Sequence, residues 1–276
     1  MTVGSLSVVG TPIGNLDDLS TRARSVLGTV PVVVAEDTRR TRILLTHIGA
    51  SPRVLSYHAH STPERVEEII EILADGEDVA LVTDAGTPGI SDPGFTLVRA
   101  ARQQGFFVSV VPGPSAVAAA LSCSGLPADR YAFLGFLPRK GTDRRELVAG
   151  AGNSPWTTVI FEAPGRLGAL FADLEGACGT DREAAVAREL TKVHEELKLG
   201  TISDLRVYYD AHPPRGEVTV MVAGQPRAPV PLDRDAIAEA ARSLLDEGHS
   251  RRDVAKQLAT ELGVARNEVY RIVTEL

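Results

Sequence analysis

The sequence is poor in the residues that build disulfide frameworks and metal sites. It has two cysteines, Cys123 and Cys178, without the short spacing of metal-ligand pairs. We therefore expect no metal centre, and a reducing cytoplasm is the simplest location. No apolar run approaches the roughly 18 residues that a membrane span needs. The N-terminal MTVGSLSVVG lacks the charged region and apolar core of a signal peptide, so we expect neither export nor a membrane partner.

Several catalytic signatures are also missing from the sequence. It contains no GxxxxGK[ST], HExxH, CxxC or GxSxG pattern, which argues against a P-loop nucleotidase, a zinc protease and a nucleophile elbow. His58 and His60 alternate around Ala59, which predicts one face of a strand and a solvated or hydrogen-bonded pair. The pattern indicates a site that binds and orients its ligands, with a cofactor carrying the reactive group.

Short β-branched runs alternate with amphipathic segments along most of the chain. In residues 62–74, Val66, Ile69, Ile70 and Leu73 recur at helical spacing. Alternating strands and helices predict an α/β fold with mostly parallel sheets. The expected strands are Leu6–Val9, Val32–Ala35, Val79–Thr83, Phe106–Val111, Tyr131–Phe136, Thr157–Phe161, Ala184–Ala187 and Glu217–Ala223, with further helices near Asp143–Ala149 and Arg166–Leu174.

A length of 276 residues corresponds to about two domains. We predict a first α/β domain over residues 1–122 and a second over 123–224. A proline-rich linker, 225–232, then leads to a helical tail, 233–276. The sequence of the tail predicts three helices, and their spacing is typical of a helix-turn-helix. The alternative is a helical tail that packs without binding nucleic acid. These helices are Arg234–Glu247, Arg251–Leu262 and Asn267–Leu276, with Ser250 as a cap and Gly263 as a break.

Four loops rich in glycine, proline and acidic residues follow expected strands. Open parallel sheets bind ligands at the carboxyl ends of their strands, so four such loops in one half of the chain predict a shared pocket. Each loop alone could serve as an ordinary turn. The loops are Gly10–Asp18, Ala35–Arg40, Thr83–Gly94 and Pro112–Ala116.

These loops carry a resemblance to a known family. The blocks VVGTPIGNLDDLS, AEDTRRTRILL, DAGTPGISDPG and VPGPSA resemble the tetrapyrrole-methylase superfamily, and the likeness continues through FLGFLPRKG, IFEAPGRL, ARELTKVHEE and RGEVTVMV. The eight blocks span residues 5–223 and are most similar to the bacterial small-subunit ribosomal RNA methyltransferases I, which act on a cytidine 2′-hydroxyl.

The resemblance implies two α/β/α domains, S-adenosyl-L-methionine bound in the cleft between them, and a homodimer. Asn15, Pro12 and Thr87 depart from the pattern of members that act on tetrapyrroles, which agrees with the ribosomal branch. The positions that the resemblance assigns to the cofactor are Pro12, Asp84, Gly86, Thr87, Pro88, Gly89, Ile90, Ser115, Ala116, Phe161, Ala187 and Val218.

Methyl transfer from a sulfonium needs alignment of the reacting atoms and help in removing the hydroxyl proton. Glu36 and Asp37 are candidate bases, and Arg39 or Lys192 could stabilise the alkoxide. Glu189 is a further candidate carboxylate. An ion-pair network between domains is the alternative interpretation of these charges.

The net charge of −7 argues against a uniformly basic surface, but basic residues gather locally. Residues 20–53 have a local charge of +4, residues 139–146 of +2 and residues 249–271 of +2. We expect the first two patches to line the cleft and the tail to contact neighbouring RNA in the 30S subunit. The candidate RNA-binding residues are Arg39, Arg40, Arg42, Arg139, Lys140, Arg144, Arg145, Arg251 and Arg252.

Three other functions stay open at this point. One is methylation of a corrinoid or another small acceptor on the same scaffold. Another is a non-catalytic RNA-binding or ribosome-assembly factor, and a third is a DNA regulator that uses the helix-turn-helix tail. Cofactor binding would distinguish the methyltransferases from the non-catalytic factor, and DNA binding by the isolated residues 233–276 would favour the regulator.

Overall fold

The computed structural model describes residues 3–225, 233–262, 264 and 266–276. Residues 3–225 form one compact unit, and the described residues from 233 onward belong to a second, helical unit. Most of the predicted linker, including its three prolines, and the predicted break at Gly263 lie outside the described residues. The predicted domain boundaries therefore remain a proposal.

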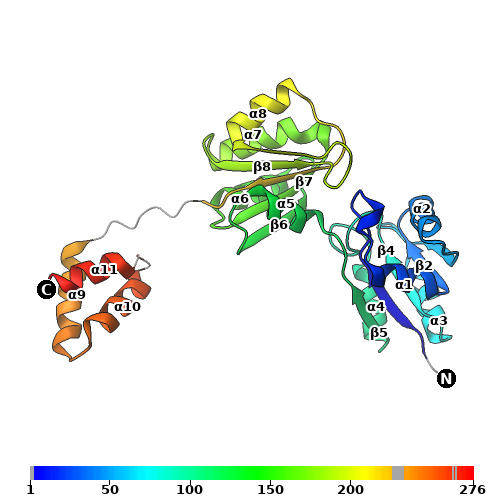
Figure 1. The fold of residues 1–276 in the computed structure, drawn as a ribbon, viewed down its shortest axis with the longest axis horizontal. Coiled ribbons are helices and arrows are strands. Elements are labelled where there is room, and N and C mark those ends of the chain that lie inside the picture. Colours follow the sequence, from blue (N-terminus) through cyan, green and yellow to red (C-terminus); the bar gives the residue numbers. More distant parts are fainter. Residues whose placement is uncertain (1–2, 226–232, 263, 265) are drawn as a thin grey trace. The chain divides into compact units, whose positions relative to one another are not determined.

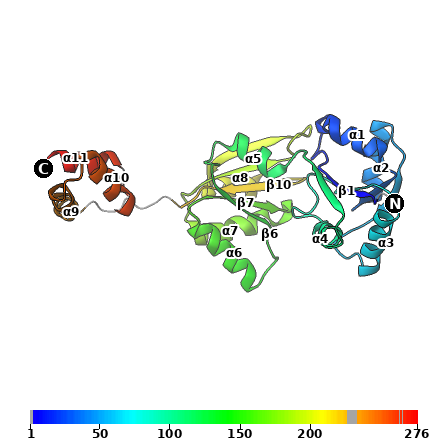
Figure 2. The same cartoon turned by 90° about the horizontal axis from the view of Figure 1, so that it is seen from below.

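The first sheet is entirely parallel and has the strand order β3-β2-β4-β1-β5. Its central strands, such as the VVVA run of β2, are buried on both faces, as crossover connections require. Helices α1 and α2 pack on one face, and α3 and α4 pack on the other (Figures 1 and 2). The elements are β1 (Ser5–Val9), α1 (Thr21–Thr29), β2 (Val32–Ala35), α2 (Thr38–Ile48), β3 (Arg53–Ser56), α3 (Pro63–Ala74), β4 (Val79–Val82), α4 (Phe95–Gln103) and β5 (Phe107–Val111), with a 3-10 turn at Leu16–Asp18.

The second sheet is mixed, with the order β6-β7-β10-β8-β9. Only β6 and β7 run parallel; the other three pairs are antiparallel, so the expectation of mostly parallel sheets is wrong for this half. Helices α6, α7 and α8 cover one face, and α5 covers the other. The elements are α5 (Ala116–Ser124), β6 (Tyr131–Phe136), α6 (Thr142–Asn153), β7 (Thr157–Glu162), α7 (Leu167–Cys178), β8 (Glu183–Arg188), β9 (Glu196–Thr201), α8 (Ile202–Ala211) and β10 (Val218–Val222), with a 3-10 turn at Pro164–Arg166.

Helix α5 packs on the second sheet, although its first residues belong to the predicted first domain. Val117, Ala120 and Leu121 of α5 share a buried cluster with Val159 of β7 and Met221 of β10. The helix therefore carries the chain from the last strand of the first sheet onto the second. Ser115, its N-cap, stands at this crossing.

The C-terminal unit has a hydrophobic core of its own. Its buried cluster consists of side chains from three helices, among them Ile237, Val254, Leu258 and Val269. The Ser250 side chain accepts a hydrogen bond from the Asp253 amide, as predicted for a cap. The three helices are α9 (Arg234–Asp246), α10 (Arg251–Leu262) and α11 (Arg266–Thr274).

Candidate active site

A cavity of about 360 Å³, here called the cleft cavity, lies where loops of the first sheet meet strand ends of the second. The first half of the chain contributes the loop after β4 and the N-terminus of α5. The second half contributes the ends of β6 and β7 and the start of β10. Its lining residues are Ile13, Ala85, Gly86, Thr87, Ile90, Ser91, Asp92, Ser115, Ala116, Val117, Phe136, Phe161, Glu162, Ala163, Pro164, Gly216, Glu217, Val218 and Thr219.

Close backbone contacts hold the loops of the first sheet together. Thr11 and Gly86 form a two-bond bridge, with N–O distances of 2.8 and 3.2 Å between the loops that follow β1 and β4. Gly10 and Gly113 pack so tightly that a Cβ on Gly10 would lie 2.7 Å from the Gly113 nitrogen. Larger residues at these two positions would push the loops apart. The glycines therefore fix the wall of the cleft cavity.

The two halves of the compact unit contact each other beside the cavity. The Asn15 amide donates a hydrogen bond to the Thr191 hydroxyl at 3.1 Å. Gly135 of β6 packs against Ser91, and a Cβ there would lie 2.8 Å from the Ser91 Oγ. Ser91, Glu189 and Thr191 are the non-glycine residues with positive φ in the described chain, at 62°, 50° and 66°. Such strain is typical of functional sites, and here all three residues lie at this junction.

The structure brings seven of the proposed cofactor positions to the cavity wall: Gly86, Thr87, Ile90, Ser115, Ala116, Phe161 and Val218. The other five, Pro12, Asp84, Pro88, Gly89 and Ala187, are not among its lining residues. Ile13 lies on the wall where Pro12 was expected, so the loop presents the neighbouring side chain.

The proposed catalytic residues surround the cavity without lining it. Asp37 caps α2 and holds Arg39 at 2.8 Å, and this contact lowers the pKa of Asp37 to about 2. Lys192 bridges Glu189 and Glu217 at 3.0 and 3.1 Å. Backbone hydrogen bonding from Glu217, together with Lys192, lowers the pKa of Glu189. These ion pairs each lie within one half of the compact unit, so they are not the network between domains that the alternative interpretation predicted. Glu217 itself reaches the cavity wall.

Asp92, Glu162 and Glu217 are the acidic residues on this wall, and the sequence-based search for catalytic residues missed all three. Glu36 lies nearby and accepts a hydrogen bond from the Thr83 hydroxyl at 2.9 Å. Burial raises the pKa of Asp92 to about 6, and the negative charges of Glu36, Asp84 and Glu217 add to the effect. Asp92 lies inside the DAGTPGISDPG block, which follows β4. This position at the carboxyl end of a parallel strand could have identified it as a candidate site residue.

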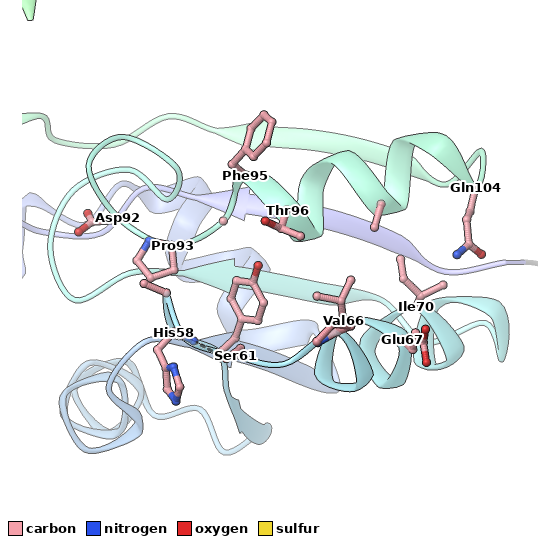
Figure 3. A pocket seen from close by; sticks show the side chains of 15 residues that line it. His58, Ser61, Val66, Glu67, Ile70, Asp92, Pro93, Phe95, Thr96 and Gln104 are labelled. Atoms are coloured by element: carbon pink, nitrogen blue, oxygen red, sulfur yellow. Dashed lines mark hydrogen bonds between the residues drawn. The ribbon is translucent and has the colours of Figure 1, made fainter. Parts of the chain in front are cut away.

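A second cavity of about 480 Å³, the His58 cavity, adjoins the first at Asp92. It lies between α3 and α4, with His58, Asp92 and Pro93 at one end and Gln104 at the other (Figure 3). The segment between Tyr57 and Thr62 is a loop with a turn, so the prediction of a strand for His58 and His60 is wrong. The His58 amide donates to Ser61 Oγ at 2.8 Å, and the His60 amide donates to His58 Nδ1 at 3.2 Å.

A third, basic groove of about 960 Å³ lies between α6 and α7. Arg139, Lys140, Arg145 and the buried Arg144 line it. Arg144 differs from the other predicted RNA contacts, because it pairs with Asp173 at 2.7 Å and lies 3.9 Å from Glu162. Its guanidinium therefore links α6 to β7 and α7 and is not available to a phosphate.

The remaining candidate RNA contacts are exposed. Arg39, Arg40 and Arg42 lie on α2, and Arg251 and Arg252 begin α10. Arg40 also lies 3.5 Å from Asp84. In the part of the chain that the structure describes, no group of three or more His, Cys, Asp or Glu side chains could hold a metal ion. Among these same residues, no helix is long and apolar enough to cross a membrane.

Comparisons with known proteins agree on one family. Residues 5–206 match the family described as Tetrapyrrole (Corrin/Porphyrin) Methylases. A ribosomal RNA small subunit methyltransferase I of Xylella fastidiosa is 46% identical over 98% of both chains. Proteins of the same name from Escherichia coli O157:H7 (38% identical, 99% of this chain and 95% of the relative) and Thermotoga maritima (42% identical, 81% and 100%) also match.

Solved structures show the same fold at lower identity. A uroporphyrin-III-C-methyltransferase from Thermus thermophilus has a TM-score of 0.57 and 22% identity, covering 80% of this chain and 94% of its own. A cobalt precorrin-4 methyltransferase has a TM-score of 0.60 and 18% identity, covering 79% and 94%. The chain therefore belongs to the tetrapyrrole methylase family and, within it, to the group of ribosomal RNA small subunit methyltransferases I.

Proposed function

We propose that the methyl donor of this methyltransferase is S-adenosyl-L-methionine, bound in the cleft cavity. The cavity is large enough for a small-molecule ligand and combines apolar walls with few polar groups, as such sites usually do. Phe136 and Phe161 form an aromatic pair with ring centroids 5.5 Å apart. Asp92 and Glu217 supply negative charge that suits a sulfonium cation. The residues present therefore fit this cofactor.

The chain's own groups would hold and orient the ligands. Gly86 and Thr87 offer a fixed backbone edge, and Ala116 leaves space at the N-terminus of α5. When bound, S-adenosyl-L-methionine supplies an activated methyl group, so the protein needs chiefly to align the acceptor and remove its proton.

A filled-cavity variant tests the cofactor site. Ala116→Phe should weaken S-adenosyl-L-methionine binding by about tenfold or more, because the ring would occupy the cavity. Ala118→Phe on the same helix is the matched control, since Ala118 is exposed and does not line the cavity. Calorimetric titration measures both. Equal affinity of the two variants would contradict the site.

For the acceptor, we propose the 2′-hydroxyl of a cytidine in small-subunit ribosomal RNA within the 30S subunit, which places the reaction in the cytoplasm. The observation that carries this proposal is near-full-length similarity to methyltransferases named for that RNA. Labelled S-adenosyl-L-methionine should transfer its methyl group to 30S particles from a strain that lacks the enzyme. No transfer to RNA, combined with transfer to a corrinoid, would overturn the proposal in favour of the small-acceptor alternative.

The exposed arginines of α2 support contact with RNA. Reversing the charge of Arg39 and Arg40 should weaken RNA binding and reduce the magnitude of its salt dependence by about one phosphate contact for each residue lost. Arg102→Glu, an exposed arginine on α4, is the control. We propose the same role for Arg139, Lys140, Arg145, Arg251 and Arg252. Unchanged binding and salt slope in the α2 variant would exclude that patch.

We also propose that the chain acts as a homodimer. Edge strand β5 exposes Phe107 and Val110, and α4 exposes Phe95, which leaves apolar area available to a second copy. Light scattering should give twice the monomer mass of 29.3 kDa. A monomer at micromolar concentration would contradict this assembly.

A further inference from the structure

Asp92 occupies a position that none of the other acidic residues near the site shares. It lies at one end of the His58 cavity (Figure 3) and also lines the cleft cavity, so it stands where the two spaces meet. A group that receives a proton from an acceptor hydroxyl must lie within hydrogen-bond reach of that hydroxyl, and the hydroxyl must itself reach the methyl donor's cavity. Asp92 lies at both cavities and meets this requirement, whereas Glu36, Asp37 and Glu189 do not line the cleft cavity. Two other carboxylates on its wall, Glu162 and Glu217, do not line the His58 cavity and are paired with Arg166 and Lys192.

The loop around Asp92 is held in one shape. Ser91 before it has a φ of 62°, and Gly94 after it has a φ of 150°. The Gly89 amide donates to the Pro93 carbonyl at 3.2 Å and closes the loop. A Cβ on Gly94 would lie 3.0 Å from the Gly89 nitrogen, so a side chain there would force the loop open. The strained backbone therefore fixes the place of the carboxyl group.

The charges around Asp92 leave it free to accept a proton. Lys192 pairs with Glu189 and Glu217, Arg40 with Asp84, and Arg39 with Asp37. Among the described residues, Asp92 takes part in no salt bridge within 4.0 Å. The charges that act on its pKa are those of Glu36 after β2, Asp84 after β4 and Glu217 before β10, all acidic. His58, a further titratable group, lines the same end of the His58 cavity. The Thr83 hydroxyl partly opposes their effect by hydrogen bonding.

We propose that Asp92 is the catalytic base that accepts the proton of the attacking hydroxyl. This proposal rests on the proposed ribose 2′-O-methylation. As the bond between the acceptor oxygen and the methyl carbon forms, the bond from that carbon to sulfur breaks and its electron pair stays on sulfur. Sulfur, which keeps that pair, leaves as a neutral thioether. The hydroxyl proton passes to an Asp92 carboxylate oxygen, so the methylated oxygen is left as a neutral ether. The hydroxyl approaches from the side of the His58 cavity.

The raised pKa of Asp92, about 6, agrees with this role, because a carboxylate that binds protons more tightly is a better base. Asp37 is unsuited, since its pKa is lowered to about 2 by Arg39. Lys192 is unsuited as well, because its hydrogen bonds to Glu189 and Glu217 raise its pKa and keep it protonated although burial opposes them.

Asp92→Asn tests the proposal with kinetics on 30S particles. The substitution keeps the shape of the side chain but removes the base, so kcat should fall by about 100-fold or more. The acid limb of the wild-type pH–rate profile should vanish. Cofactor affinity should change by no more than about threefold, whereas a merely electrostatic role toward the sulfonium would weaken it more and spare kcat. Glu71→Gln, an exposed residue of α3, is the matched control and should retain wild-type kcat.

A measurement on the protein without substrate gives a second readout. In carbon-13 carboxyl NMR, the Asp92 resonance, identified by its loss in Asp92→Asn, should titrate near pH 6. Glu36→Gln should move this midpoint downward, because it removes one of the neighbouring negative charges. A midpoint at the ordinary Asp value of about 4 would contradict the proposed environment.

The outcomes separate the two proposals. If the wild-type chain methylates the RNA and Asp92→Asn does so at a similar rate across pH 5–8, Asp92 is not the base and the proposed function stands. If the wild-type chain transfers no methyl group to the RNA, the proposed function fails, and the assignment of Asp92 as its base fails with it.

Discussion

Folding makes the Asp92 carboxyl group harder to ionise. The ionised form that the proposed base requires therefore lowers the stability of the native state. Its pKa is raised to about 6 in the native state, mainly by burial. The native state therefore binds more protons than the unfolded chain between about pH 4 and 6, and the contribution of Asp92 to stability falls as the pH rises through this window.

Asp92→Asn should therefore stabilise the protein at pH 7.5. After allowance for partial solvent screening, we expect a gain of about 1–2 kcal/mol that shrinks toward zero near pH 4. Urea unfolding at both pH values measures it, with Glu71→Gln as control. If the variant were less stable than the wild type at pH 7.5, the native environment would favour the ionised Asp92 carboxylate, contrary to this prediction. Such a gain would resemble that seen at other active sites, where residues needed for activity lower the stability of the folded protein.

At the residue scale, the sequence predicted the glycine-rich loops that line the cavity better than the acidic groups on its wall. Gly86, Thr87, Ile90, Ser115 and Ala116 line the cavity because loops after neighbouring parallel strands must converge. Glu217 was missed because nothing in the sequence shows that the start of β10 faces the loop after β4. The burial that raises the pKa of Asp92 likewise depends on tertiary contacts.

At the scale of elements, Glu162 ties together the segments on the second-sheet side of the cleft cavity. Its side chain is 1% exposed at the end of β7, and Arg166 pairs with it at 3.1 Å. Arg166 also donates to the Leu137 carbonyl at 2.7 Å, and Arg144 donates to the Pro138 carbonyl at 3.0 Å. This network connects the end of β7 to the loop between β6 and α6.

Glu162→Ala should destabilise the protein by about 3–5 kcal/mol, because it leaves buried arginine charge without its partner. Glu68→Ala, which breaks the exposed pair with Arg65 on α3, should cost less than about 1 kcal/mol. Denaturant unfolding of both variants gives the comparison. Equal losses would show that the Glu162 network does not stabilise this part of the fold.

The two strands that the sequence failed to predict, β3 and β9, both lie at the edge of a sheet. β3 is a short edge strand with Arg53 exposed, and β9 alternates charged and apolar residues along ELKLGT at the edge of the second sheet. Edge strands are partly solvated, so their residues lack the apolar run that revealed the buried strands β2 and β4. The antiparallel pairing of the second sheet also escaped prediction, since the alternation of strands and helices does not determine strand direction.

At the scale of the whole molecule, the helical tail and residues 3–225 have separate cores. The relative from Thermotoga maritima aligns over its full length with 81% of this chain. About a fifth of this chain therefore has no counterpart in that relative. The loops that we propose to bind the cofactor all lie before residue 225, so for the tail we propose RNA contact only.

A chain that ends at Gln225 should fold and bind S-adenosyl-L-methionine with an affinity within about threefold of the full chain. Its affinity for 30S particles should fall, with a smaller salt dependence, because Arg251 and Arg252 are lost. Calorimetry and filter binding measure the two quantities. Loss of cofactor binding on truncation would show that the tail is part of the cofactor site.

Mapping of the methyl group after reaction with 30S particles tests the central claim most directly. Mass spectrometry of the digested small-subunit RNA should find one new cytidine methylated on its ribose 2′-oxygen. The product should form with wild-type protein and with Ala118→Phe, and it should be greatly reduced with Ala116→Phe. A methyl group on a base, or product formed equally by both variants, would contradict the account.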